Sequence, residues 1–336
     1  MTQRVDTGSG CAAGLACDAK LGRGAEPAAG SLSASQIDVW ERELGVPVSA
    51  FEALWGGRDV QDAAADLGRW KSLGALLAGV TAWSAAELAR LSGLQHAAFE
   101  PSTLAAAFDT IVPLDPGSRT LRGNLRDVVN VQHSRSVLVR VGESRLARID
   151  LTAPGVSIIG APDVGCHAAG LGHLSFERVE LMSHELGQVS AADLVDLDRK
   201  RRVFVARALC AWARELLDDT IGFLSSRRFG AGSLIDQQVT RHRLADLIGS
   251  QMLVEAQLAR AEHDRSLLFV AEVMSSVLPE LVKECQQLHG GRGFLVEYWV
   301  SRAYRDSLCL SLLLGPSDEL RARIAQQLSP SWRFED

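Results

Sequence analysis

The stretch Gln287-Leu-His-Gly-Gly-Arg-Gly-Phe294 places three glycines directly after an apolar segment with helical periodicity, at about residues 267–288. A second helical segment covers about residues 238–263, and a longer one precedes it. In the longer segment, apolar residues recur at alternating steps of three and four, which predicts one buried stripe along a long helix. These patterns predict a four-helix bundle over residues 189–330. The expected stripe consists of Val203, Ala206, Cys210, Ala213, Leu217, Thr220 and Leu224.

Working outward from the bundle, the remaining segments differ in character. Shorter helices are predicted near residues 297–314 and 317–328. Residues 99–188 contain short β-prone runs separated by turn signals, which predicts a small β domain built as a barrel or a sandwich. Residues 34–98 are expected to form a helical unit, and residues 1–33, rich in Gly, Ala and Ser, a flexible tail. The predicted fold is mainly α with a central β domain. The expected strands lie at 136–141, 145–150 and 155–159.

The composition excludes several classes of protein. The chain has 336 residues and a formal net charge of −6, so it offers no basic surface for nucleic acid. No apolar run reaches the roughly 18 residues that span a membrane, and the N-terminus lacks the features of a secretory signal. The six cysteines are scattered, without a CxxC pair or zinc-ligand spacing, so no metal site is expected. We therefore expect a cytoplasmic protein that binds neither nucleic acid nor membrane.

Several segments resemble motifs of the acyl-CoA dehydrogenase family. The most specific is the stretch at 287–294, which resembles the family's QxxGGxGY segment. The resemblance extends over about residues 88–328. It implies the acyl-CoA dehydrogenase fold, with a shortened N-terminal helical unit, a small β-barrel or sandwich and a C-terminal four-helix bundle. The other matching segments are Pro154-Gly155-Val156, Arg228-Phe-Gly230, Gln238, His242-Arg-Leu-Ala-Asp246, Glu297-Tyr298, Tyr304-Arg-Asp306 and, for part of a turn, Glu100-Pro101.

The resemblance also implies a chemistry. Family enzymes remove two hydrogens from the α and β carbons of an acyl thioester, and a carboxylate takes the α-proton while FAD accepts the β-hydride. Each FAD lies across a subunit boundary, with its adenosine diphosphate end on the neighbouring chain. FAD is therefore the implied cofactor, and an acyl-CoA or acyl-carrier thioester is the implied substrate. The residues assigned to a neighbour's dinucleotide are Phe229, Gln238, Gln287, Gly290 and Gly291, with Arg227 or Arg228 as candidate phosphate ligands.

Each of these assignments has a structural alternative. Gly290 and Gly291 could simply end a helix, and Phe229 could be a core residue. Arg227 and Arg228 could be solvated basic residues near a helix end. The sequence leaves these alternatives open.

The family pattern fails at the catalytic base. The common position of the catalytic glutamate falls on Leu314, ahead of Gly315-Pro316, and a second position used in the family falls on Lys200. Leucine cannot accept a proton, and lysine is ordinarily protonated at neutral pH. Asp198 is near Lys200 but on a different helical face. The segment that should lie against the flavin ring, Trp-Ile-Thr in the family, is Asp127-Val-Val129 here. The sequence therefore identifies no catalytic residue.

Some bacterial family members, including enzymes that shorten steroid side chains, are mixed tetramers in which one chain carries the base and a shorter chain completes the dinucleotide end. We therefore expect a subunit of a heteromeric, FAD-dependent acyl-CoA dehydrogenase, partnered by a homologous glutamate-bearing subunit. Two alternatives remain open. One is a self-sufficient flavoenzyme that binds its flavin as a homomer and whose base has moved. The other is a non-catalytic binding protein that has kept the fold.

Overall fold

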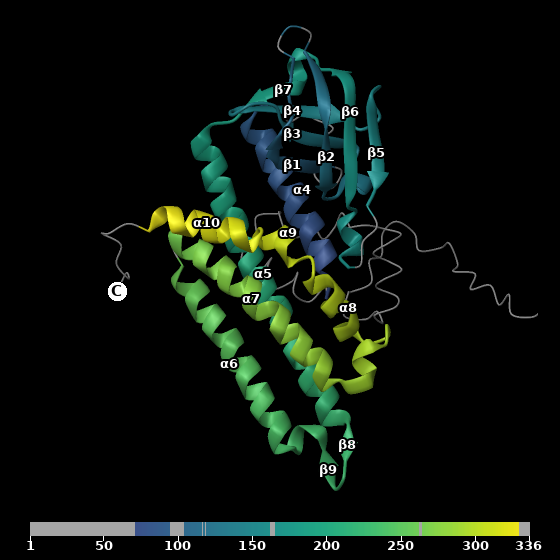
Figure 1. The fold of residues 1–336 in the computed structure, drawn as a ribbon, viewed down its shortest axis with the longest axis vertical. Helices are drawn as coiled ribbons and strands as arrows, with labels where there is room; N and C mark the ends of the chain where they lie inside the picture. The colour runs from purple at the N-terminus through teal and green to yellow at the C-terminus, as the bar shows by residue number, and fades with distance from the viewer. Residues whose placement is uncertain are drawn as a thin grey trace, which may run out of the picture.

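The computed structural model describes residues 71–94, 104–115, 117, 119–161, 165–261 and 264–328 (Figure 1). The predicted tail at 1–33, most of the predicted helical unit at 34–98 and the Glu100-Pro101 turn lie outside the described residues. Within the described ranges, none of the helices has a stretch of sufficient length and low polarity to cross a lipid bilayer.

The central part of the chain folds into two β-sheets that share a core. One sheet has the strand order β1-β3-β4-β7 and the other β2-β6-β5; β1 and β3 are parallel, and the other pairs are antiparallel. In β6, Leu174 and Phe176 are buried while the intervening Ser175 is partly exposed, as expected for a strand with one face on the core. The domain is therefore a β-sandwich, one of the two predicted forms. Its strands are β1 (Leu104–Ile111), β2 (Thr120–Val128), β3 (Ser136–Arg140), β4 (Arg145–Asp150), β5 (Val156–Gly160), β6 (Gly172–Glu180) and β7 (Leu186–Gln188).

The C-terminal part is a helical bundle, as predicted. Its long first helix starts where the Ser190 side chain accepts the Asp193 N–H at 3.0 Å, an N-cap that satisfies one of the free donors of the first turn. The predicted stripe along this helix is buried except at Val203, which is half-buried. The bundle elements are α5 (Ala191–Ser226), β8 (Arg228–Phe229), β9 (Gly232–Ser233), α6 (Gln238–Arg260), α7 (Asp264–Leu288), α8 (Trp299–Ser307), α9 (Leu310–Leu314) and α10 (Ser317–Gln327).

The segment predicted as one helix over residues 297–314 forms two, α8 and α9. At the break, the Leu308 N–H donates to the Arg305 carbonyl at 3.2 Å and the Cys309 N–H donates to the Asp306 carbonyl at 2.9 Å. Both bonds span three residues instead of four, which tightens the last turn of α8 and ends it. No glycine or proline marks this break, so the pattern of the sequence did not predict it.

A further helix, α4 (Leu73–Leu91), lies between the sandwich and the bundle (Figure 1). It begins at Ser72, whose side chain accepts the Ala75 N–H at 3.1 Å. An added Cβ at Gly74 would lie 2.7 Å from the Cys166 backbone, so α4 approaches the loop between β5 and β6 at backbone distance. The same loop approaches α8, because a Cβ at Gly165 would lie 2.5 Å from the Arg305 backbone.

Asp306 holds this three-way junction together. Its side chain is buried, and Oδ1 accepts the Cys166 N–H at 2.7 Å. Arg302, one helical turn earlier and also buried, donates to the Lys71 carbonyl just before α4. Burial raises the pKa of Asp306, and the positive charge of Arg302 opposes that effect. Two side chains of α8 therefore tie the sandwich and α4 to the bundle.

We expect Asp306→Ala to lower the free energy of unfolding by roughly 3–5 kcal/mol, because it leaves the buried Arg302 charge and the Cys166 N–H without their partner. Urea denaturation followed by circular dichroism measures this change. Glu319→Ala, at an exposed position in the first turn of α10, is the control and should change stability by less than about 0.5 kcal/mol. Equal effects of the two substitutions would contradict the role of Asp306.

Candidate functional site

The residues predicted to bind a neighbour's dinucleotide lie at the end of the bundle far from the sandwich (Figure 1). Here α5 ends, the β8–β9 hairpin follows, α6 begins, and α7 passes into a short 3-10 turn at Gly290–Phe294. Phe229 is 57 % exposed in the hairpin, which excludes the alternative that its side chain is a core residue. Gln238 and Gln287 are also exposed. We call this region, with Arg227 and Arg228, the dinucleotide surface.

The three glycines after α7 serve different purposes. Gly290 has φ of +58°, the left-handed conformation in which helices commonly end, so helix termination accounts for it. Gly293 is buried, and an added Cβ would lie 2.4 Å from the Gln286 carbonyl oxygen. Gly291 is exposed, and its added Cβ would meet no other atom within 4 Å. The chain itself therefore does not require glycine at 291, which leaves room there for an external group to approach the backbone.

An aromatic cluster joins α5 to the loop that carries these glycines. The Phe223 ring stacks on His289 with centroids 4.2 Å apart, and Tyr298 packs edge-on against Phe223 at 5.8 Å. The Arg227 guanidinium lies 5.9 Å from the Phe223 centroid. Sequence reasoning missed Phe223 and Tyr298. For Phe223, the sequence offered one signal of this contact. Phe223 and Arg227 are four residues apart, a spacing that places both side chains on one face of α5.

His289 is fixed within this cluster. Its Nδ1 lies 2.8 Å from the Cys285 carbonyl oxygen, which can only accept, so Nδ1 carries the proton. Nε2 is buried, has no hydrogen-bond partner among the residues that the structure describes, and lies 4.0 Å from Asp219 Oδ2. Burial lowers the pKa of His289 below its ordinary value, outweighing the opposing effects of the Cys285 carbonyl and Asp219. The ring is therefore neutral at pH 7 and has a structural position beside the glycines.

Neither predicted base position carries a usable base. Leu314 is buried at the end of α9, where its carbonyl accepts from Arg202 at 3.4 Å, and the Leu313 carbonyl accepts from Arg201 at 3.3 Å. Cationic side chains favour such C-terminal carbonyls, so the two arginines clamp α9 onto α5. The Lys200 ammonium pairs with Asp196 at 2.8 Å.

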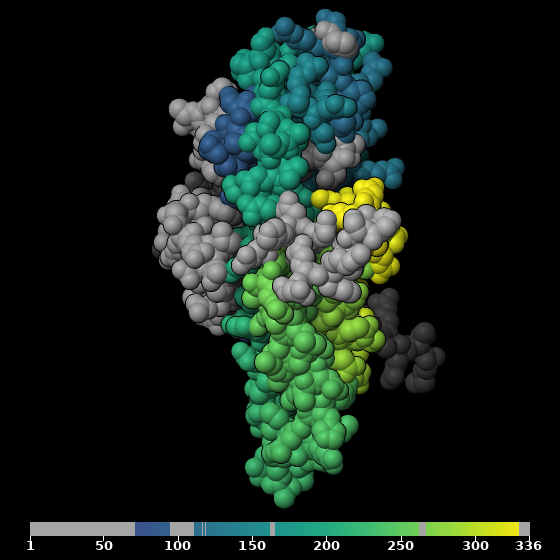
Figure 2. All heavy atoms as spheres, turned by 90° about the vertical axis from the view of Figure 1, so that its left-hand side faces the viewer, coloured from purple at the N-terminus to yellow at the C-terminus, as the bar shows by residue number. Residues whose placement is uncertain are grey.

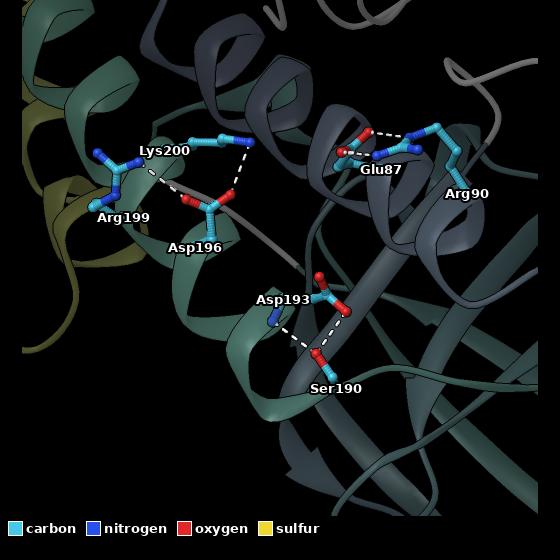
Figure 3. Close-up of polar contacts among 7 residues, drawn as sticks. All are labelled: Glu87, Arg90, Ser190, Asp193, Asp196, Arg199 and Lys200. Atoms are coloured by element: carbon cyan, nitrogen blue, oxygen red, sulfur yellow. Dashed lines mark hydrogen bonds and ion pairs between the residues drawn. The ribbon is translucent and has the colours of Figure 1, made fainter.

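The carboxylates near these positions are engaged as well (Figure 3). Asp196 binds both Lys200 and Arg199, and these hydrogen bonds lower its pKa. Glu87 of α4 pairs with Arg90, and the hydrogen bond from Arg90 holds the Glu87 pKa below its ordinary value although burial opposes it. Each is an ionised partner in a surface ion pair, which does not favour proton abstraction from a weak carbon acid.

Asp198 is likewise committed to structure. Its Oδ2 accepts from Arg202 at 3.0 Å and from Arg323 of α10 at 3.1 Å. Burial acts to raise the pKa of Asp198, but the charges of Arg202 and Arg201 and the two hydrogen bonds outweigh it, so the pKa is lowered. The carboxylate therefore links α5 to α10 as a permanent anion.

The segment predicted to face a flavin ring offers little polar chemistry. Val128 is buried in the sandwich core and Val129 is half-buried. Asp127 has φ of +54°, and its N–H donates to His173 Nδ1 at 3.2 Å. The two valines have no side-chain donor for a ring heteroatom.

Neither a metal site nor a reactive thiol on α5 or α7 is found among the described residues. These residues contain no group of three or more His, Cys, Asp or Glu side chains that could hold a metal ion. Cys210 and Cys285 are core residues, and burial raises the pKa of each thiol to about 12. Both therefore remain protonated and unreactive at neutral pH.

We expect Gly293→Ala to destabilise the fold by about 1–3 kcal/mol, because the new methyl group overlaps the Gln286 carbonyl. Gly291→Ala should change stability by less than about 0.5 kcal/mol, since nothing in the chain opposes it. Thermal and urea unfolding measure the stability of the two variants. A similar loss of stability in both would show that Gly291 also has a packing role.

We expect His289 to make stability depend on pH. Below about pH 6.5 the unfolded chain protonates this histidine while the folded chain does not, so the free energy of unfolding falls as the pH is lowered through this window. His289→Gln removes that contribution. Its destabilising effect, measured by urea unfolding, should therefore be smaller at pH 5 than at pH 8, and an effect that is constant across this range would contradict the assignment.

Comparisons with known proteins agree with this architecture. Residues 194–329 match the family model of the acyl-CoA dehydrogenase C-terminal domain. The chain is 24% identical over 228 residues to the probable acyl-CoA dehydrogenase YngJ of Bacillus subtilis, covering 60% of this chain and 58% of that protein. It is 24% identical over 176 residues to the mouse mitochondrial long-chain specific acyl-CoA dehydrogenase, covering 49% and 41% of the two chains. The matches thus span about half the length of these relatives.

The fold comparison covers more of the chain. A probable acyl-CoA dehydrogenase from Mycobacterium abscessus superimposes with a TM-score of 0.76 at 18% identity, covering 90% of this chain and 96% of that one. This likeness confirms the predicted fold class, which is mainly α with a central β domain. Residues 194–329 therefore resemble the C-terminal domain of acyl-CoA dehydrogenases, and the chain as a whole shares the fold of these enzymes.

Proposed function

We propose that this chain is a subunit of an FAD-dependent acyl-CoA dehydrogenase that desaturates an acyl thioester between its α and β carbons. In this proposal it completes the FAD site of a homologous, glutamate-bearing partner and does not supply the base. The observation that carries the proposal is a contrast within one bundle. The base positions at Leu314 and Lys200 are occupied by a buried leucine and an ion-paired lysine, whereas the dinucleotide surface is open.

The residues of the dinucleotide surface fit the adenosine diphosphate end of FAD. Gly291 leaves its backbone accessible, and Phe229 exposes an aromatic face. Arg227 and Arg228 would supply positive charge for the diphosphate. Gln238 and Gln287 would supply exposed side-chain amides that can form hydrogen bonds. When bound, FAD would supply the acceptor for the hydride that leaves the β carbon. This chain's contribution is to hold and orient the dinucleotide.

The residues at the other end do not fit a complete active site. No carboxylate stands at either base position, and the nearby Asp198 is held by two arginines. The proton on the α carbon must therefore be taken by a group of the partner.

The surface of α6 supports assembly with another chain. Its inner face buries Leu244, Leu247, Val254 and Leu258. Its outer face nevertheless exposes Val239, Ile248, Met252 and Leu253, the last at 73 %. In Figure 1, α6 is the outermost helix of the bundle, and the green atoms of this region face the viewer in Figure 2. A helix that is apolar on both faces is normally covered, so a partner subunit or a second copy is expected on this side.

The test is turnover of acyl-CoA thioesters by this chain combined with a full-length, glutamate-bearing family member from the same genome, with a dye as electron acceptor. Replacing the partner's glutamate with glutamine should lower turnover by about 10²–10⁴-fold. Lys200→Ala in this chain should leave turnover unchanged within about twofold, since it breaks only a surface ion pair.

Two results would overturn this function. Turnover by the chain alone would favour a self-sufficient flavoenzyme with a relocated base. A stable complex that binds no flavin and shows no turnover would favour a non-catalytic binding protein.

A further inference from the structure

Two cysteines meet at the junction between the sandwich and the bundle. Cys166 lies in the loop between β5 and β6, and Cys309 lies between α8 and α9, directly before Leu310. Both are reduced thiols in this structure. They are far apart in the sequence, so it is the fold that brings them together.

Each thiol contacts the backbone beside the other cysteine. The Cys309 thiol donates to the carbonyl of Gly165, the residue before Cys166, at 3.9 Å. The Cys166 thiol donates to the Asp306 carbonyl at 3.6 Å, and the same oxygen accepts the Cys309 N–H at 2.9 Å. The Cys166 sulfur and the Cys309 backbone therefore contact one oxygen atom, which places the two side chains close together.

The backbone around the two thiols is held in place. A Cβ added at Gly165 would lie 2.5 Å from the Arg305 backbone, so the loop and α8 meet at backbone distance. The Cys166 N–H also donates to Asp306 Oδ1 at 2.7 Å. Such close backbone contact is what a disulfide requires, since its two Cα atoms lie within about 7 Å of each other.

The two thiols differ in exposure. Cys166 is fully buried, whereas Cys309 is half-buried and follows the exposed Leu308. Because oxidation of a thiol depends on its exposure, a small oxidant reaches the Cys309 sulfur first. The buried Cys166 is then in position to act as the resolving thiol.

We infer that Cys309 and Cys166 form a redox-sensitive latch, in which hydrogen peroxide converts the two thiols to a disulfide that joins the sandwich loop to the end of α8. The Cys309 sulfur attacks one peroxide oxygen, the O–O bond breaks, and a sulfenic acid and one water form. The Cys166 sulfur then attacks the Cys309 sulfur, the S–O bond breaks, and the oxygen leaves as a second water with the Cys166 proton. The two thiols lose two electrons, and the peroxide gains them.

The latch does not rest on the proposed function, because it concerns the junction and not the FAD site. A disulfide here would bind the loop to the segment that leads into α9. Opening of the junction would then require the bundle and the sandwich to move as one unit.

The experiment treats the full chain carrying Cys11→Ser and Cys17→Ser with hydrogen peroxide, so that the four other cysteines alone can react. Mass spectrometry of a non-reduced digest should find a fragment that links Cys166 to Cys309, and a dithiol reductant should remove the link. The unfolding temperature of the oxidised chain should rise by roughly 5–10 °C, because the cross-link restricts the unfolded state.

Single substitutions distinguish the latch from unspecific oxidation. Cys309→Ser, at the half-buried position, should abolish both the link and the rise in unfolding temperature. Cys166→Ser should leave Cys309 as a sulfenic acid, which a 1,3-diketone probe labels. The matched control is Cys210→Ala, at a buried thiol of α5, which should form the link as readily as the parent chain.

Three results would overturn the latch. In the first, peroxide takes Cys309 to a sulfinic acid in the parent chain and no link forms. In the second, the link appears only when the chain is oxidised in urea. In the third, the link forms in the folded chain but the unfolding temperature does not rise.

Discussion

The buried carboxylate of Asp306 is the interaction on which the arrangement of this molecule depends. It accepts the Cys166 N–H from the sandwich, while Arg302, on the same helix, donates to the Lys71 carbonyl ahead of α4. Three units distant in sequence therefore meet at one point on α8. The close backbone contacts at Gly74 and Gly165 are possible only because neither residue has a side chain.

The 36-residue helix α5 then separates the two halves of the site. At 1.5 Å per residue it is about 54 Å long. The arginines that clamp α9 lie about a third of the way along this helix, and Phe223 and Arg227 lie at its end. In this first third of α5, Arg201, Arg202 and Asp198 hold α9 and α10 in place, and neither expected base position carries a carboxylate. At the other end, the exposed Gly291 leaves its backbone open to an external group. The helix α5 thus has ion pairs that stabilise the fold in its first third and exposed candidate binding residues at its other end. This difference is the physical basis for proposing that the chain contributes binding residues to a neighbour's FAD site.

Much of the fold could be predicted because its signals are local. The stripe from Ala206 to Leu224 follows from periodicity alone, and the strands β3 and β4 follow from β-prone runs between turn signals. The break between α8 and α9 could not, since it depends on hydrogen bonds at the Asp306 junction and not on a turn-forming residue. At the candidate site, the motif identified the glycines but not their different purposes. Only the structure separates Gly290, which has a left-handed backbone, from Gly293, which packs against Gln286, and Gly291, which does neither. The cluster of Phe223 and Tyr298 joins residues 75 positions apart, beyond the reach of any local pattern.

The measurement that tests the central claim most directly is the FAD content of the purified chain by visible absorbance, alone and after assembly with a glutamate-bearing family member. A chain that only completes its partner's FAD site should be colourless when purified alone. Flavin should then appear only in the assembled complex, with a single FAD for each pair of unlike chains. A stoichiometric amount of FAD bound to the chain purified alone would contradict the account, because the flavin-ring half that this chain lacks would then have to be supplied from within it.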